Sequence, residues 1–92
     1  MQARVKLHVK GRVQGVFYRQ STLSQARHLG LCGWVANEMD GSVKIDAQGE
    51  KAKLESLLLW CHKGPPSAIV LEMDVEWLDE LDSTYSSFEV RR

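Results

Sequence analysis

The chain has 92 residues, of which 12 are Lys or Arg and 12 are Asp or Glu, so its formal net charge is zero. This length predicts a single domain over residues 1–92, and a hydrophobic content of 43% is typical of a globular protein and excludes a disordered one. A neutral chain has no overall positive field for a nucleic acid or an acidic membrane, so any anion site must be local.

The first half of the chain predicts a strand, a helix and a strand hairpin. Apolar and polar residues alternate over residues 5–13, a pattern typical of a strand with one buried face. Apolar residues recur at helical spacing over residues 20–30, where a glycine ends the helix. Residues 33–37 are strand-like, and Asp40-Gly41 is a strong hairpin signal before a second alternating segment, residues 43–49.

The second half predicts a helix and a strand, followed by a possible short terminal strand around Phe88 and Val90. The helix starts after Glu50, and the run Lys63-Gly64-Pro65-Pro66 ends it. Alternation then resumes from residue 69, and the polar face of this strand is mostly acidic. The apolar stripe of the helix is Leu54, Leu57, Leu58 and Cys61, and the apolar face of the strand is Ile69, Leu71, Met73, Val75 and Trp77.

The order βαββαβ predicts an α+β fold of the ferredoxin-like kind, in which two helices cover one face of an antiparallel sheet. A single crossover helix joins the first two strands, so they point the same way, with the third strand inserted between them. Their C-terminal ends therefore lie at one rim of the sheet. The turn that starts at Gln14 and the residue Asn37 both lie at that rim.

The segment from Gly11 to Arg19 has the features of a phosphate-binding turn. A glycine turn at Gly15 leads from the first strand to an arginine at the predicted helix start. Backbone N–H groups at such a turn and at a helix N-terminus point one way, and the guanidinium adds a planar fork of donors. On spacing alone, the pattern favours an ordinary strand-to-helix turn with an exposed arginine over a binding site.

Asn37 offers an amide donor and a carbonyl acceptor, which suits the positioning of a water molecule beside a bound phosphate. An asparagine before a hairpin also shapes the turn, and the residue type alone favours that structural role. Phe17 and Tyr18, beside the glycine turn, are candidates for the wall of a ligand pocket. His8 lies on the polar side of the first strand and is expected to be solvated.

The remaining patterns predict no metal site and no other cofactor. Cys32 and Cys61 have neither CxxC spacing nor a partner histidine at metal-ligand spacing, so we expect free, buried thiols. No apolar run approaches the roughly 20 residues that span a bilayer, and the first ten residues lack the apolar core of a signal peptide. These patterns predict a cytoplasmic protein with no membrane partner.

Two motifs give the chain a resemblance to the acylphosphatases. Residues 11–19, GRVQGVFYR, are similar to the family's phosphate-loop pattern G-x-V-Q-G-V-x-F-R, and Tyr18 stands where the family usually has phenylalanine. Residues 33–49 match the second family pattern, which begins GWVAN and continues to Gly41-Ser42-Val43 and Gly49. With the βαββαβ order, the resemblance covers essentially the whole chain.

The resemblance implies metal-independent hydrolysis of a small acyl phosphate to a carboxylate and inorganic phosphate. It also implies that Arg19 and Asn37 are the catalytic residues, with Asn37 orienting the attacking water. The phosphate-binding loop that it implies consists of Gln14, Gly15, Val16, Phe17, Tyr18 and Arg19.

The alternatives are a ferredoxin-like module that binds RNA or another anion, and a domain that keeps the loop but has lost turnover. Residues 43–49 lack the aromatic pattern of an RNA-binding strand, which argues against nucleic acid. Because no exposed apolar face is obvious in the sequence, we expect a monomer.

Overall fold

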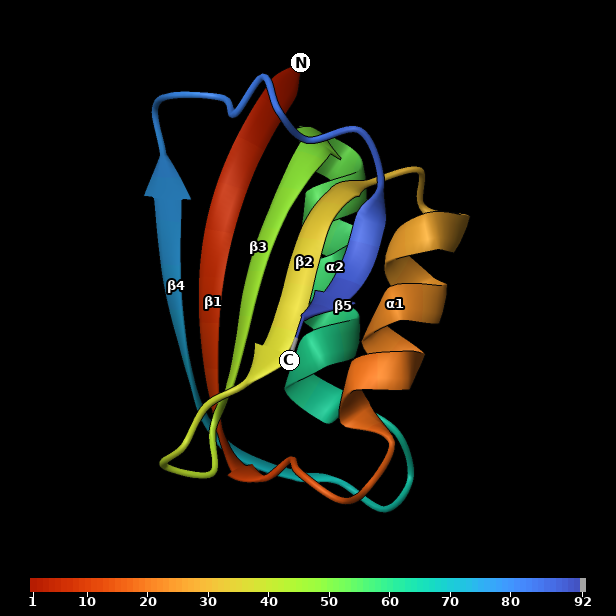
Figure 1. The fold of residues 1–92 in the computed structure, drawn as a ribbon, viewed down its shortest axis with the longest axis vertical. Helices are drawn as coiled ribbons and strands as arrows, with labels where there is room; N and C mark the ends of the chain where they lie inside the picture. Colours follow the sequence, from red (N-terminus) through yellow and green to blue (C-terminus); the bar gives the residue numbers. More distant parts are fainter. Residues whose placement is uncertain (92) are drawn as a thin grey trace.

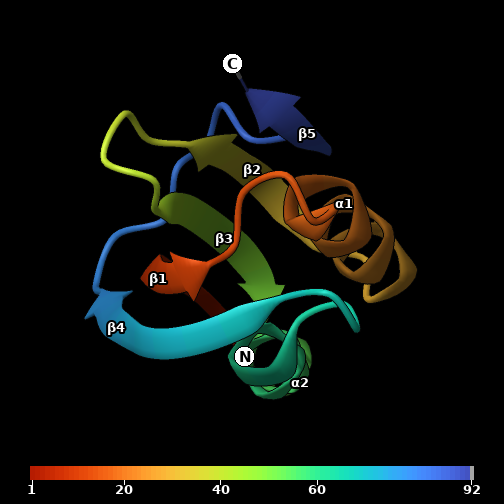
Figure 2. The same ribbon diagram turned by 90° about the horizontal axis from the view of Figure 1, so that it is seen from below.

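The computed structural model describes residues 1–91 and has the predicted order of elements, including the terminal strand (Figure 1). The elements are β1 (Gln2–Arg12), α1 (Tyr18–His28), β2 (Cys32–Asn37), β3 (Val43–Glu50), α2 (Lys51–Lys63), β4 (Ile69–Leu78) and β5 (Phe88–Arg91). Both helices lie on one face of the sheet, as Figure 2 shows from below. No helix within residues 1–91 is long and apolar enough to cross a membrane.

The sheet has the strand order β4-β1-β3-β2-β5. Strand β3 pairs antiparallel with both β1 and β2, so these two strands are parallel to each other with β3 between them, as predicted. The four predicted strands form the expected antiparallel sheet, and the terminal strand β5 makes the sheet mixed by pairing parallel with β2 at one edge. The C-terminal ends of β1 and β2 consequently lie at the same rim of the molecule.

The core lies between the sheet and the helices. Val5, Leu7 and Val9 of β1 are buried, which confirms the alternation in the first strand. The stripe of α2 is buried at three of its four positions, and Leu58 is half-buried. The buried residues of α1 are Tyr18, Thr22 and Ala26, whereas Leu23 of this helix and Leu29 just after it lie at the margin of the core.

Strand β4 departs from the prediction, because its apolar face is largely exposed. The exposed fractions are 75% for Leu71, 40% for Val75 and 41% for Trp77. A shift of register between Lys10 and Gly11 of β1 leaves Leu71 without a cross-strand partner, and β4 is an edge strand. The expectation that the molecule has no exposed apolar face is therefore wrong.

Candidate active site

The turn after β1 and the end of β2 form the walls of one cavity of about 550 Å³. Gln14, Gly15 and Phe17 line it from the turn, Arg19 lines it from α1, and Asn37 lines it from β2. The β1–α1 turn and the β2–β3 hairpin loop both lie at the lower end of the molecule in Figure 1. The structure thus brings together the residues that the topology places at one rim.

The backbone of the turn has two residues in the left-handed region. Gly15 has φ 71°, a conformation that suits glycine, but Phe17 also has φ 63° and ψ 22°. A non-glycine residue held there costs on the order of 1 kcal/mol or more, and such residues cluster at functional sites. The side chain of Phe17 is 79% exposed, so its own packing does not explain the conformation.

Phe17 immediately precedes α1, whose first turn has neither a side-chain cap nor an acidic residue. The first N–H groups of a helix have no partner within the helix, and the helix dipole favours an anion beside them. The left-handed turn therefore leads directly into a set of donors suited to a phosphate. Val16, by contrast, is buried and packs in the core.

Arg19 follows in the first turn of α1 and lines the same cavity, half-buried. Within residues 1–91 its guanidinium forms no salt bridge, although five other salt bridges occur there. Its positive charge is therefore not neutralised by a carboxylate of the described chain. A guanidinium in this state can bind a phosphate bidentately.

Asn37 ends β2 opposite Val43. Its side-chain oxygen Oδ1 is buried and has no hydrogen-bond partner within residues 1–91. Leaving a buried acceptor unsatisfied costs about 1–3 kcal/mol. Asn37 as a residue lines the cavity, so its side-chain amide lies beside the space where a substrate and a water molecule would bind.

The side chain of Gln14 crosses from the turn to the β2–β3 hairpin. Its Nε2 donates to the backbone carbonyls of Glu38 and Ser42, each at 2.8 Å. Both amide hydrogens are thereby used, so this side chain has no hydrogen left to donate to a ligand in the cavity. Nothing in the spacing of the sequence indicates these partners.

Tyr18 lines the cavity, as expected, but its hydroxyl forms its hydrogen bond in the core. Its ring is buried, and the hydroxyl donates to the backbone carbonyl of Cys61 in α2 at 2.7 Å. Burial raises the pKa of this phenol well above its usual value. The departure from the family pattern thus lies in the core.

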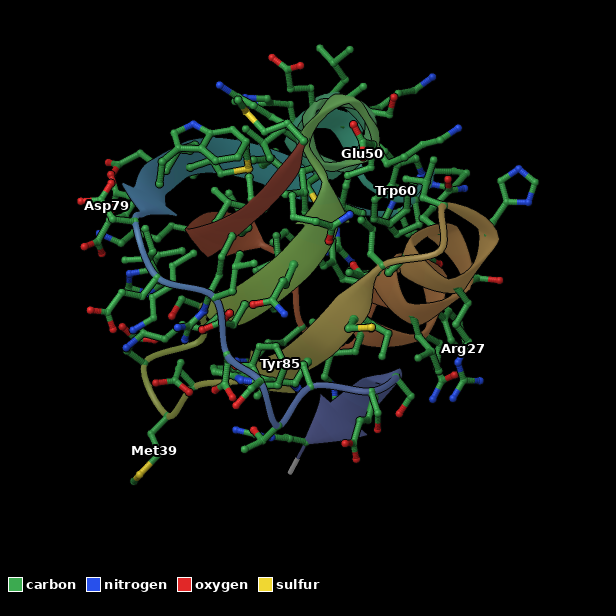
Figure 3. The ribbon with its side chains drawn as sticks, turned by 90° about the horizontal axis from the view of Figure 1, so that it is seen from above. Arg27, Met39, Glu50, Trp60, Asp79 and Tyr85 are labelled. Atoms are coloured by element: carbon green, nitrogen blue, oxygen red, sulfur yellow. The ribbon has the colours of Figure 1, made fainter. Side chains whose placement is uncertain are left out.

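His8 is not simply solvated, as the strand parity suggested. Its Nε2 lies 2.6 Å from the hydroxyl of Ser42, which donates to the Asp40 carboxylate at 2.5 Å. The hydrogen bonds from Ser42 lower the pKa of Asp40 below its usual value. These contacts order the base of the hairpin, while Met39 at its tip projects into solvent (Figure 3).

A second cavity, of about 460 Å³, lies on the open face of the sheet. Lys6 and Lys44 line it together with Asp74 and Glu76, so it has charges of both signs. This mixture does not single out an anion as its ligand. Within residues 1–91, no group of three or more His, Cys, Asp or Glu side chains is placed to hold a metal ion.

Comparison with known proteins identifies relatives over almost the whole chain. The family model described as Acylphosphatase matches residues 5–90. An acylphosphatase of Anaeromyxobacter dehalogenans is 46% identical over 88 residues, which are 96% of this chain and 94% of that protein. Two solved structures are also similar. An acylphosphatase from Coxiella burnetii has TM-score 0.91 and 39% identity, covering 98% of this chain and 93% of its own. One from Bacillus subtilis has TM-score 0.93 and 32% identity, covering 100% of both chains.

Proposed function

The chain belongs to the acylphosphatase family, and we propose that the cavity between the β1–α1 turn and β2 is where it hydrolyses an acyl phosphate. Arg19 and the backbone N–H groups from Gln14 to Tyr18 bind the phosphate, and Asn37 orients the attacking water. The observation that supports these roles is that Arg19 and Asn37 line one cavity, while within residues 1–91 the guanidinium forms no salt bridge and the amide oxygen accepts no hydrogen bond.

In the proposed reaction, the water oxygen forms a bond to phosphorus, and the bond between phosphorus and the carboxylate oxygen breaks. The carboxylate leaves with the electron pair, and inorganic phosphate is the second product. Among residues 1–91, the side chains that line the cavity carry amides, one guanidinium and the phenol of Tyr18, whose hydroxyl donates to Cys61, but no carboxylate or imidazole. We therefore assign the proton lost by the water to an oxygen of the substrate's own phosphate.

This chemistry needs few protein groups. The leaving carboxylate has a conjugate acid with a pKa of roughly 4, so it departs without a general acid. Phosphoryl transfer depends mainly on positioning and on donors aimed at the equatorial oxygens of phosphorus, where charge accumulates. Arg19 and the turn supply the donors, and Asn37 supplies the position of the water. No metal ion is required for any of these steps.

The proposal includes the finer expectations from the sequence. The protein acts in the cytoplasm as a monomer, as one domain over residues 1–92, on a small acyl phosphate and without a nucleic-acid partner. The neutral net charge supports the last of these, since a polyanion would find no overall attraction.

The test is hydrolysis of benzoyl phosphate in the presence of a chelator, corrected for spontaneous hydrolysis. The parent protein is expected to turn over under these conditions, and no rate above background would refute the proposed function. Arg19→Ala is expected to weaken inhibition by inorganic phosphate at least about 10-fold, because it removes the charge that holds the anion.

Asn37→Ala is expected to lower kcat about 100-fold or more while inhibition by phosphate changes little. Arg27→Ala is the matched control for the arginine, because Arg27 lies in the last turn of the same helix outside the cavity lining, where its guanidinium donates to the carbonyl of Phe88 at 3.3 Å. A parent-like kcat for Asn37→Ala would remove the role assigned to the amide.

A further inference from the structure

The two hydrogen bonds of Gln14 fall on the two carbonyls that also close the β2–β3 turn. The carbonyl of Ser42 accepts from the backbone N–H of Glu38 at 2.8 Å, and the carbonyl of Glu38 accepts from that of Gly41 at 3.1 Å. A carbonyl oxygen has two lone pairs, so each accepts one bond from the turn and one from Gln14. One side chain thus supplies a second donor to both of these carbonyls.

These contacts are adjacent to Asn37 on both strands of the hairpin. Glu38 follows Asn37 in the chain, and Ser42 precedes Val43, which is the register partner of Asn37. The backbone of Gln14 belongs to the turn that lines the phosphate end of the cavity. The Gln14 side chain therefore connects the turn after β1 with the β2–β3 hairpin, next to Asn37.

We propose that Gln14 is a positioning residue that sets the place of the Asn37 amide relative to the phosphate-binding turn. This inference rests on the proposed function. Its physical basis is that a nucleophile displaced by about 1 Å can cost on the order of 100-fold in rate. A direct role of the side chain as a phosphate ligand is disfavoured, because both amide hydrogens are already donated to protein carbonyls.

The first test is Gln14→Met, which keeps the length of the side chain and removes both donors. We expect kcat for benzoyl phosphate to fall about 10-fold or more, with the inhibition constant for inorganic phosphate within about twofold of the parent. Backbone hydrogen exchange at Glu38 and Gly41 is expected to accelerate, because the turn loses its outside support. The Tm and the exchange of β1 amides report whether the fold is retained.

The second test is Gln14→Glu, measured as a ratio to the parent at each pH. An ionised carboxylate has no donor and faces two carbonyl oxygens, whereas the neutral carboxyl group has one O–H to donate. The relative kcat is therefore expected to rise as the pH falls from about 7 towards 4.5. Gln2→Glu, in the exposed first residue of β1, makes the same chemical change and is expected to show a flat ratio.

The outcomes separate this inference from the function on which it rests. An inactive parent protein refutes the proposed function itself. If the parent is active and Gln14→Met has a parent-like kcat, only the positioning role is overturned. The same conclusion follows if Gln14→Met loses phosphate affinity in step with kcat. If Gln14→Met does not fold, a flat pH ratio for Gln14→Glu overturns the inference in the same way.

Discussion

Replacing Tyr18 by phenylalanine is expected to weaken the fold and to leave catalysis unchanged. The hydroxyl donates to the carbonyl of Cys61 in the last turn of α2, where carbonyl groups have no helical N–H to accept from. Four residues further on stands Pro65, which has no N–H at all. The phenol of Tyr18 therefore satisfies an acceptor that the helix cannot satisfy.

The magnitude follows from burial on both sides of this bond. Tyr18 is 1% exposed and the side chain of Cys61 is fully buried, so water does not replace the lost donor. Removing one partner of a buried hydrogen bond costs about 1–2 kcal/mol, which for a domain of this size lowers the Tm by about 4–16 °C. Urea unfolding of the parent and of Tyr18→Phe measures the difference directly, with an unchanged m-value as the check on two-state behaviour.

The matched control is Tyr85→Phe, the same change at the other tyrosine of the chain. Its hydroxyl accepts from the indole N–H of Trp34 at 3.0 Å and is only half-buried, so the loss is expected to be smaller. Equal stabilities for Tyr18→Phe and the parent would refute the reasoning. A 10-fold loss of kcat/KM in Tyr18→Phe would show instead that the hydroxyl acts in the site.

Two further predictions concern thiol reactivity and acid stability. Burial raises the pKa of the Cys61 thiol to about 12, so an aromatic disulfide reagent at pH 8 is expected to label only the half-buried Cys32 in native protein and both thiols in denaturant. Cys32→Ser should then show no native labelling; labelling of that variant would contradict the burial of Cys61. Hydrogen bonds from Ser42 hold the pKa of Asp40 below its ordinary value of 3.8, so the unfolded chain takes up the proton first and acid favours unfolding. The stability that parent Asp40 adds over Asp40→Asn is expected to be present above about pH 4 and to shrink at lower pH, as measured by urea unfolding; a constant difference from pH 6 to pH 3 would contradict it.

The sequence predicts the meeting of Arg19 and Asn37 because that meeting depends only on topology. Once one crossover helix joins two strands of the same sheet, their C-terminal ends lie at one rim, whatever the side chains are. The family motifs add the expected roles. The roles themselves stay predictions until the variants are measured.

The contacts that order the site depend on side-chain reach and are not visible in any periodicity. Gln14 bonds to carbonyls 24 and 28 residues away, and His8 to a hydroxyl 34 residues away. Strand parity places His8 on the polar face correctly, but it does not say that Ser42 lies within reach on the neighbouring loop. Such partners depend on where the loops lie in three dimensions. The alternation and spacing of residues in the sequence do not determine this.

Strand β4 shows a second physical limit, because alternation predicts the faces of a strand but not how much of a face the helices cover. Trp77 lies opposite Val5 in the register, and therefore on the helix side, yet Val5 is fully buried and Trp77 is 41% exposed. Five strands spaced about 4.8 Å apart span roughly 19 Å, whereas the axes of two packed helices lie only about 10 Å apart. The strand at the edge then lies largely beyond the helix layer, and Lys51 of α2 reaches it with its Nζ 5.4 Å from the centre of the Trp77 ring. On the other face of β4 the acids are not a field of like charge, because the Nζ of Lys10 lies 3.9 Å from the Glu72 carboxylate and 3.7 Å from that of Asp74, so the exposed apolar side chains are what distinguish this edge.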